Sequence, residues 1–472
     1  MARADLTIKG GWIVRPEGTF RAGLAIRDGK IAVMAEDDAL PPAEQVIDAS
    51  GKVVMAGLID PHVHAREPGL TEREDWRTVT MAAAAGGVTT IFDMPNCIPP
   101  VNTVDAFTLK RQAAEAKAVV DFGLIAGAGI THIGHIPALA AAGAVAFKTF
   151  LHEPYPDRMV EFGGLYATDN GTLMELFAAV ARTGRVQCVH AEDNAIVEHA
   201  TEKLMKAGRR DPLAHCESRP VIAEVEAVAQ TVLLAAHTGV RLHLVHVTTG
   251  SAAELVETFR ARGIRNVTME TCPQYLVLNE ETMTRVGPYA RMSPPLRPEA
   301  ERAKLLARFK AGTIDVLGTD HGPHTAAAKE RGRDDIFQAP AGAQGLETSL
   351  PVMLTLAARG EFDLPFLTRV ASQTAARLFG LYPRKGAIAV GSDADLVIVD
   401  PHREHTIDRR RFYTKERDAA HVFDGWKATG APVMTLVRGT VVMRDGEVVG
   451  TPGTGRMVTP ERVAPAPPEV IR

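Results

Sequence analysis

Two histidines near the start of the chain have the spacing of metal ligands. His62 and His64 stand two residues apart in LIDPHVHAREPG, at the end of an apolar run. Successive side chains of a strand alternate between its faces, so both imidazoles would point to the same side. Two imidazoles aimed at one point can bind one divalent ion. The pair alone is weak evidence, because two such histidines also occur by chance in a core or on a surface.

Four other apolar runs carry a polar residue at or near their ends, and these strengthen the metal-site hypothesis. They are Lys148 in AFKTFL, His190 in CVHAEDN, His246 in LVHVTTG and Asp320 in GTDHGPH. Histidine and aspartate are good ligands for zinc and similar divalent ions. We therefore predict one metal site built from these side chains and the first histidine pair, with coordination positions left for water and substrate.

Lys148 has two interpretations, because an ammonium group cannot bind a metal ion. In the first, the lysine forms a salt bridge with a neighbouring acid. In the second, the amine is held neutral and is carboxylated by carbon dioxide, which supplies two oxygens that bridge two cations. The sequence leaves both open.

Three more histidines flank these positions. His243 and His246 are three residues apart on one predicted strand and would face opposite sides. We assign His246 to the site and His243 to the interface between strand and helix. His321 and His324 lie in the loop after the last run, where either contacts substrate or has a structural role.

The elements that must position these residues follow a repeated pattern of short apolar runs alternating with helical stretches, typical of βα units. Helical patterns cover residues 76–86 and 253–263. Eight strands are predicted, over residues 52–60, 87–94, 120–127, 144–151, 185–191, 241–247, 265–271 and 314–320. Eight such units predict an α/β fold of the (β/α)8 TIM-barrel type, whose active sites lie at the carboxyl ends of the strands.

The two chain ends have a different pattern, with short alternating strands and Asp-Gly turns in LAIRDGKIAVMA and VVMRDGEVVG. They predict one small discontinuous β-sandwich. The domain boundaries we expect are 1–54 and 385–455 for the two parts of the sandwich, 55–384 for the barrel, and 456–472 for a proline-rich C-terminal tail on the surface.

Composition and net charge limit the kinds of molecule that the protein is expected to bind. The chain has 472 residues and a formal net charge of −4 from 57 acidic and 53 basic residues, which gives no basis for binding nucleic acid or an anionic membrane. Its four cysteines are widely spaced, and we identify neither a signal peptide nor a run of about 18 apolar residues. We expect a cytoplasmic enzyme that acts on a small molecule.

Motifs along nearly the whole chain resemble those of the cyclic amidohydrolases, the group of dihydroorotase, hydantoinase, dihydropyrimidinase and allantoinase. In the order of that family they are HVHAREPG, AAAGGVTTIFDMPN, FKTF, VHAED, LVHVTTG, ETCPQYL, SPPLR, GTDHGPH, GLETSLPVMLT and KGAIAVGSDADLVIVD. The resemblance implies ring opening of a cyclic amide by a homodimer or homotetramer. Some relatives are noncatalytic scaffolds that have lost metal ligands, which is a remote alternative because every ligand position is filled in this chain.

The resemblance also implies two zinc ions. One would be held by His62, His64 and Asp320 and the other by His190 and His246, with carboxylated Lys148 and a hydroxide bridging them. Two cations lower the pKa of a water and stabilise the oxyanion that forms from the amide carbonyl. Asp320 would take the proton of the hydroxide and pass it to the leaving ring nitrogen.

The motifs that bear on the substrate resemble two different groups within the family. Arg66 and Asn96 resemble the dihydroorotase pair that binds the substrate carboxylate, and so does the stretch comprising His324, Pro340, Ala341 and Gly342. An alternative role for Arg66 is an ion pair with Glu67 or another loop acid. Ser293 stands where dihydroorotases have asparagine, and the sequence around Tyr275 is closer to hydantoinases and allantoinases. The sequence favours dihydroorotate or a similar carboxylate-bearing ring, with 5-substituted hydantoins or allantoin as the alternative.

Overall fold

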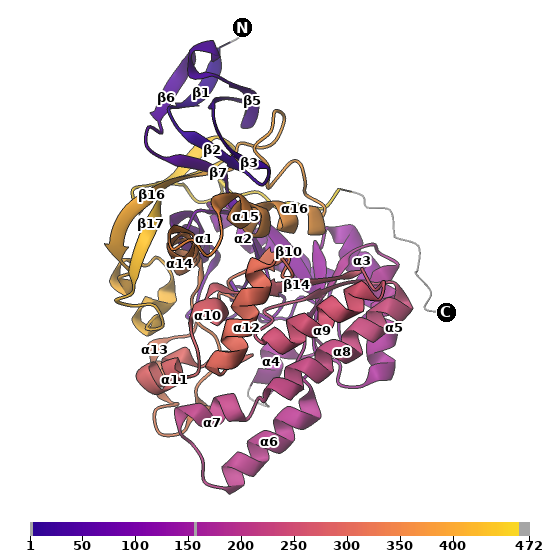
Figure 1. Cartoon of the computed structure of the whole chain (residues 1–472). Helices are drawn as coiled ribbons and strands as arrows, with labels where there is room; N and C mark the ends of the chain where they lie inside the picture. Colours follow the sequence, from indigo (N-terminus) through magenta and orange to yellow (C-terminus); the bar gives the residue numbers. More distant parts are fainter. Residues whose placement is uncertain (1–2, 155–157, 462–472) are drawn as a thin grey trace.

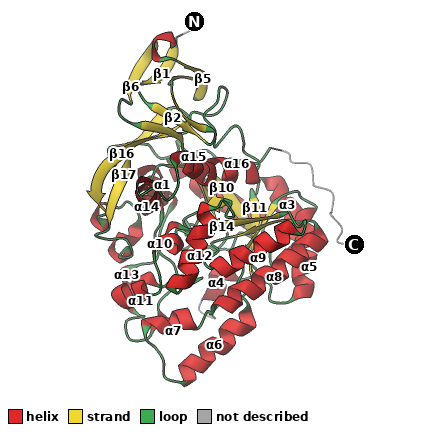
Figure 2. Ribbon diagram, viewed as in Figure 1, coloured by secondary structure: helices red, strands yellow, loops and turns green. Residues whose placement is uncertain are grey.

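Eight parallel strands, each hydrogen-bonded to the next in chain order, form the central sheet of the protein (Figures 1 and 2). The structure is a computed structural model that describes residues 3–154 and 158–461. The strands are β8 (Leu58–Val63), β9 (Val88–Asp93), β10 (Asp121–Gly127), β11 (Ala146–Phe150), β12 (Val186–His190), β13 (Arg241–Leu244), β14 (Val267–Thr271) and β15 (Val316–Leu317).

The sheet closes into a barrel between its first and last strands. Val63 at the end of β8 forms a parallel bridge with His321, four residues beyond β15, and the His64 amide donates to the His321 carbonyl at 2.8 Å. This closure confirms the predicted (β/α)8 class and brings the carboxyl ends of all eight strands to one rim.

The predicted first strand, residues 52–60, is divided at Gly57. Residues Val53–Ala56 form β7, which belongs to a sheet of the chain ends, and only β8 enters the barrel. A Cβ atom on Gly57 would lie 2.2 Å from the Cγ2 atom of Thr89, so only glycine lets the backbone pass this close to β9. An uninterrupted apolar run hides this break, which is why the sequence predicted a single strand.

Helices follow the barrel strands, and the two patterns predicted at residues 76–86 and 253–263 are confirmed by α1 and α9. The helices are α1 (Trp76–Ala85), α2 (Val104–Lys117), α3 (Ile136–Ala142), α4 (Met159–Phe162), α5 (Asn170–Ala181), α6 (Asn194–Lys206), α7 (Pro212–Glu217), α8 (Val221–Thr238), α9 (Gly250–Ala261), α10 (Pro273–Val277), α11 (Glu281–Val286), α12 (Glu299–Lys310), α13 (Ala326–Glu330), α14 (Leu346–Ala358), α15 (Leu364–Thr368) and α16 (Thr374–Leu378).

Both chain ends contribute to one seven-stranded sheet, in the order β19-β18-β17-β16-β7-β2-β3, and the remaining N-terminal strands form a four-stranded sheet, in the order β5-β4-β1-β6 (Figure 1). The strands are β1 (Ala4–Lys9), β2 (Trp12–Arg15), β3 (Gly18–Arg21), β4 (Gly23–Arg27), β5 (Lys30–Ala35), β6 (Ala43–Asp48), β16 (Leu396–Thr406), β17 (Lys427–Val437), β18 (Thr440–Arg444) and β19 (Glu447–Val448). Leu24 and Ile26 from the four-stranded sheet share a core with Leu396 and Leu436 from the seven-stranded sheet.

Both predicted Asp-Gly turns join neighbouring strands. Asp28 and Gly29 have φ of 52° and 74° between β4 and β5, and Asp445 and Gly446 have φ of 49° and 84° between β18 and β19. Positive φ at both central residues is what a tight hairpin turn requires, and Asp-Gly tolerates it. The domain boundaries themselves stay predictions.

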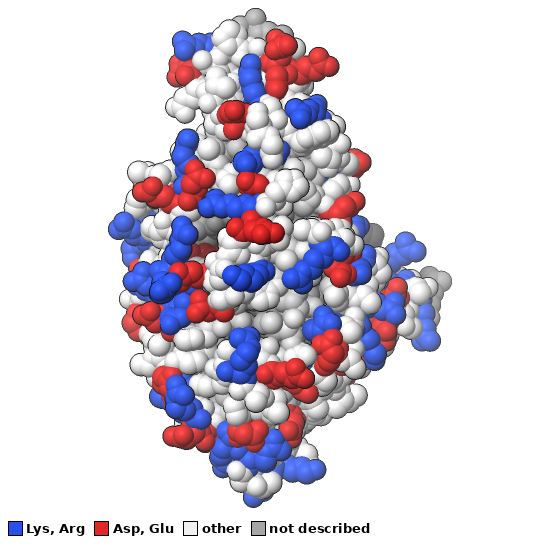
Figure 3. All heavy atoms as spheres, turned by 60° about the vertical axis from the view of Figure 1, so that its left-hand side comes forward, with Lys and Arg blue, Asp and Glu red and all other residues white. Residues whose placement is uncertain are grey.

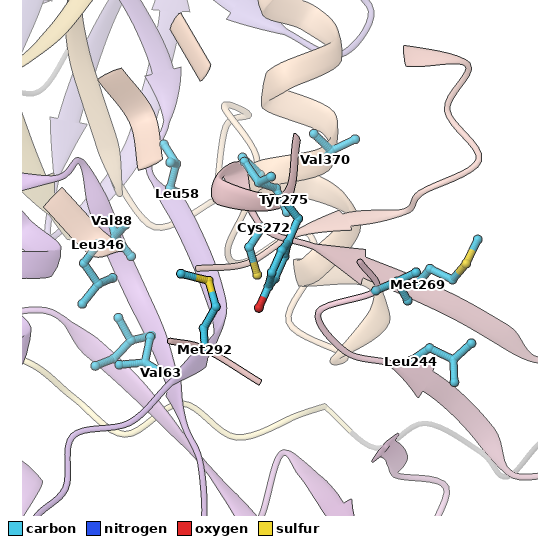
Figure 4. Close-up of a cluster of buried hydrophobic side chains, with 14 of the residues drawn as sticks. Leu58, Val63, Val88, Leu244, Met269, Cys272, Tyr275, Met292, Leu346 and Val370 are labelled. Atoms are coloured by element: carbon cyan, nitrogen blue, oxygen red, sulfur yellow. The ribbon is translucent and has the colours of Figure 1, made fainter. Parts of the chain in front are cut away.

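Two apolar cores fix the barrel. Phe379 after α16 packs edge-on against Phe92 of β9, with ring centroids 4.8 Å apart. Leu58 and Val88 also share a core with Leu346 of α14, and Figure 4 labels these three side chains within the cluster. The barrel strands therefore pack against both α14 and the chain that follows α16.

The C-terminal residues that the structure describes run along the barrel. The Phe122 amide of β10 donates to Arg456 at 3.0 Å, and the Val458 amide donates back to Phe122 at 2.7 Å. The rest of the predicted tail, residues 462–472, lies outside the described residues.

The distribution of surface charge and one long apolar helical run are relevant to whether the protein binds nucleic acid or a membrane. On the face drawn in Figure 3, basic and acidic side chains are interspersed. The run Pro212–Thr238, comprising α7 and α8, is long and apolar enough to cross a membrane, but 44% of its most apolar stretch is buried inside the structure. Core helices have the same composition, so this run is weak evidence for a membrane span.

Candidate metal-dependent active site

A cavity of about 420 Å³ opens at the carboxyl ends of the barrel strands. Every site residue predicted from the sequence lines it except Lys148, which lies buried beside it. The predicted residues that line it are His62, His64, Arg66, Asn96, His190, His246, Ser293, Asp320, His324, Pro340, Ala341 and Gly342. Residues up to 280 positions apart therefore converge on one space because the barrel brings its strand ends together.

His62, His64 and Asp320 form a group that can hold a divalent ion. Their potential ligand atoms all lie within 4.8 Å of one another. The Oδ1 atom of Asp320 is 3.3 Å from the Nε2 atoms of both histidines. Two imidazole nitrogens and one carboxylate oxygen are a donor set typical of zinc and related ions.

A second pair of imidazoles faces this group. The Nδ1 atom of His190 and the Nε2 atom of His246 are 3.0 Å apart. The ring of His246 lies 5.0 Å from the ring of His62, which joins the two sets of side chains into one cluster. Burial holds the pKa of both His190 and His246 well below the usual value, so each ring is neutral and offers a lone pair.

Three histidines have their outward nitrogen fixed by a partner outside the cluster. Glu270 accepts a hydrogen bond from Nδ1 of His62 at 2.9 Å, and Asn96 accepts one from Nδ1 of His64 at 2.7 Å. Glu192 accepts one from Nε2 of His190 at 2.7 Å. A proton fixed on one ring nitrogen leaves the other free to bind a metal ion.

Lys148 lies at the floor of the site with an isolated amine. Its side chain is fully buried, and among the described residues its Nζ atom has no hydrogen-bond partner and no carboxylate within 4 Å. Burial lowers the pKa of Lys148 to about 8. The amine therefore loses its proton more readily than an ordinary lysine, and the absence of a carboxylate partner among the described residues favours the carboxylation hypothesis over the salt bridge.

The backbone is strained at the rim. Arg66, His246 and Asp320 have φ of 62°, 38° and 51°, a left-handed conformation that residues other than glycine rarely adopt. Such strain is concentrated at functional sites, where the surrounding fold enforces it. Here it turns side chains into the cavity just after their strands end.

His243 corrects one sequence assignment. It does not lie between strand and helix but inside the barrel below the cavity, where its Nε2 atom is 3.3 Å from Glu270. Its register partner on β12 is Cys188, which in turn pairs with Lys148 on β11, so all three face inward. Strand alternation predicted the wrong face because β13 ends at Leu244 and the positive φ of His246 turns that residue inward as well.

The two loop histidines differ. His324 lines the cavity, 3.4 Å from Nη2 of Arg66, and burial holds its pKa well below the usual value. His321 points elsewhere, since its Nδ1 atom accepts from the Gly345 amide and its Nε2 atom is 3.5 Å from Glu74. His324 is therefore the one placed to contact a ligand.

Glu270 is one residue of the site that sequence reasoning missed. It is fully buried on β14 and connects His62 at 2.9 Å to His243 at 3.3 Å. Burial opposes its ionisation, but these two histidines together lower the pKa of Glu270. The available signal was an acid within an apolar strand, at the head of ETCPQYL.

Replacing Glu270 by glutamine is expected to weaken zinc binding by about 10- to 100-fold, because His62 loses the partner that fixes its ring. Competition with a chelator would measure the affinity. Glu257→Gln changes an exposed acid on α9 in the same way and serves as the control. Equal zinc affinity in the two variants would show that Glu270 does not orient His62.

A closed parallel barrel with histidines and an aspartate converging at its carboxyl rim defines the class of metal-dependent barrel hydrolases. The chain belongs to the amidohydrolase family, whose model matches residues 53–442. It is 38% identical over 457 residues to an L-hydantoinase of Paenarthrobacter aurescens, covering 96% of this chain and 98% of that enzyme. It is 38% identical over 459 residues to an allantoinase of Deinococcus radiodurans, covering 97% and 99%.

Other comparisons agree on the chemistry. A dihydroorotase of Methanothermobacter thermautotrophicus is 37% identical over 451 residues, covering 95% of this chain and 96% of that enzyme. The structure of the L-hydantoinase (dihydropyrimidinase) from Arthrobacter aurescens superposes with a TM-score of 0.93 at 38% identity, covering 97% of this chain and 100% of the other. The protein is accordingly a hydrolytic cyclic amidase.

Proposed function

We propose that the protein opens five-membered cyclic ureides, 5-substituted hydantoins or allantoin, with two zinc ions in its site. The observation that carries this is the complete ligand cluster in a chain that matches an L-hydantoinase and an allantoinase at 38% identity over almost their whole length. The sequence favoured dihydroorotate, but these comparisons support the hydantoinase or allantoinase alternative better.

The cluster divides naturally between two ions. His62, His64 and Asp320 would hold one, and His190 and His246 the other, with carboxylated Lys148 between them. Two divalent ions supply Lewis acidity and an acidified water when they are bound. The buried, unpartnered Nζ atom of Lys148 and the Nδ1 atom of His246, which also lacks a partner among described residues, fit a site that needs further ligands.

Asp320 is the group placed to move the proton. Burial raises the pKa of its carboxyl, while His62 and Lys148 oppose that rise. Its carboxylate lies at the mouth of the barrel, where it would take a proton from the attacking water and return it to the ring nitrogen as the C–N bond breaks. Catalysis by such a group needs a carboxylate that is ionised and yet basic enough to accept the proton.

Dihydroorotate remains the second candidate because of Arg66. This guanidinium lines the cavity beside His324 and Asn96, and a guanidinium binds a carboxylate through two parallel hydrogen bonds. Ser293 and the stretch Pro340–Gly342 would complete the substrate contacts, and Ala341 already accepts a hydrogen bond from His324 at 3.1 Å.

Turnover of a substrate panel tests the proposal. Zinc-loaded protein should open hydantoins or allantoin with a higher kcat/KM than dihydroorotate, and dihydrouracil is included as a ring without a carboxylate. If dihydroorotate is opened best, the second candidate is correct. If none of these rings is opened while zinc is bound, the proposed substrates are wrong.

Replacing Arg66 by methionine is expected to lower kcat/KM for carboxylate-bearing rings by about tenfold or more, because charged hydrogen bonds of this kind contribute that much. Metal content should not change. Arg308→Met, which alters a partly exposed arginine on α12, is the matched control. An unaltered preference in the Arg66 variant would mean that its ion pair is structural.

The assembly and location stay expectations. We infer a homodimer or homotetramer in the cytoplasm from the resemblance to other cyclic amidohydrolases, and size-exclusion chromatography of the purified chain tests the first of these.

A further inference from the structure

Three arginines surround one buried glutamate in the wall of the cavity. Glu161 on α4 is 2% exposed, and its carboxylate lies 2.7 Å from Nε of Arg158, 3.2 Å from Nη1 of Arg73 and 3.7 Å from Nη1 of Arg66. The three arginines come from two separate loops, one after β8 and one after β11. All three line the cavity.

The charges in this wall do not balance. Burial opposes ionisation of Glu161, but Arg158 and Arg66 outweigh it and lower the pKa of that carboxyl to about 2. Among the described residues, Glu161 is the only buried carboxylate within 4 Å of the three guanidiniums. Glu72 lies 3.5 Å from Arg73, but its side chain is 61% exposed and solvent screens it. Among residues 3–154 and 158–461, Arg66 and Arg158 have no other carboxylate within 4 Å.

The deepest of the three arginines has unused donors. Arg66 is 3% exposed, and its Nε and Nη1 atoms make no hydrogen bond to any described residue. Leaving buried charged donors without acceptors is costly in free energy. The Arg66 side chain lines the cavity, so a ligand that enters it can approach this guanidinium.

The positive charge extends outward from the metal ligands. Arg66 lies beside His324 and is followed towards solvent by Arg158 and Arg73, whose side chains are 20% and 26% exposed. A substituent that leaves the ring near Arg66 and extends along this wall would pass from one guanidinium to the next. Arg158 also stacks over Phe162, 4.6 Å from its ring centroid, so its position is fixed.

We infer that the wall of Arg66, Arg158 and Arg73 selects cyclic ureides whose exocyclic substituent ends in a carboxylate. This substrate class rests on the proposed ring-opening function and narrows it. Arg66 binds the near part of the substituent, and Arg158 and Arg73 bind its anionic end. Glu161 holds the three guanidiniums in place and limits their mutual repulsion.

A matched pair of substrates tests this inference. Hydantoins substituted at C5 with a carboxyethyl or a carbamoylethyl group have the same length and differ in charge. The wild-type protein should open the carboxylate with a kcat/KM at least about tenfold higher, as expected for charged hydrogen bonds. This ratio should fall as salt is added, because the outer arginines are partly exposed.

Two variants assign the effect to the wall. Arg158→Gln is expected to remove most of the preference. Glu161→Gln is expected to increase it, because among the described residues Glu161 is the only buried carboxylate within 4 Å of these arginines. Arg308→Gln on α12 is the control and should leave the ratio unchanged. Thermal unfolding of each variant shows whether it remains folded.

The outcomes separate the two proposals. If zinc-loaded protein opens neither these two hydantoins nor allantoin, the ring-opening proposal fails and the substrate class fails with it. If allantoin is opened and neither hydantoin is, only the substrate class is overturned. If both are opened at similar rates, only the substrate class is overturned. A preference that survives Arg158→Gln and is not increased by Glu161→Gln overturns the assignment to this wall, and shows that these residues only anchor α4.

Discussion

Replacing Asp320 by asparagine is expected to lower kcat/KM for ring opening by about a thousandfold, within the range contributed by a positioned general base. Asparagine has nearly the same shape and keeps one oxygen near the Nε2 atoms of His62 and His64, each 3.3 Å away in the wild type. It cannot accept a proton at that position. Steady-state kinetics on the best substrate of the panel would measure the loss.

The matched control for Asp320 is Asp418→Asn, since Asp418 is an exposed acid in the 3-10 helix η8 (Lys415–Ala419), with its side chain 81% exposed. That variant should keep wild-type activity. Zinc analysis of the Asp320 variant separates a lost base from a lost ligand. Activity within a few fold of wild type in zinc-containing Asp320→Asn would overturn the role assigned to this carboxylate.

Replacing Lys148 by methionine is expected to prevent the binding of two zinc ions per chain. It should also abolish more than about 99.9% of the activity, because metal catalysis requires both ions to be held by their ligands. Methionine fills much the same buried space, and the Nζ atom that it removes has no hydrogen-bond partner among the described residues. The fold should therefore tolerate the change, which circular dichroism would verify.

Carboxylation of Lys148 gives an independent readout. Protein prepared with ¹³C-labelled bicarbonate should show a carbamate carbon signal that is absent from Lys148→Met. Lys304→Met alters an exposed lysine and should retain both the signal and the zinc. A methionine variant with full zinc content and activity would refute the bridging role of this lysine.

Much of the site was predictable because the place of a residue along a barrel strand determines whether its side chain lies at the rim. An apolar run followed by a polar residue places that residue at the rim, whichever strand carries it, as the lining of the cavity by His62, His190, His246 and Asp320 illustrates. The Asp-Gly turns at Asp28 and Asp445 were predictable for a similar reason, since only a few residues tolerate positive φ.

Other features depend on contacts between distant parts of the chain. Glu270 contacts His62 across 208 positions, and Arg66 pairs with Glu161 rather than with Glu67, the acid next to it in the sequence. Glu67 is instead engaged by Lys117 of α2 at 2.5 Å. Strand periodicity carries no information about such partners, because it fixes the face of a residue and not its neighbour on another strand.

Contacts and backbone geometry beyond the local pattern also explain the two predictions that were wrong. The break at Gly57 follows from the close approach of Thr89, which belongs to the next strand. The inward direction of His243 follows from where β13 ends and from the backbone turn at His246. In both cases the backbone departs from the regular strand geometry that the sequence pattern assumes.

Titration of metal-free protein with zinc tests the central claim most directly. After chelation, the protein should open none of the hydantoins or allantoin, and activity should return in proportion to added zinc up to two ions per chain, as two sets of ligands around Lys148 require. Full ring-opening activity in protein shown to be metal-free, or activity that is complete at one ion per chain, would contradict a site with two metal ions.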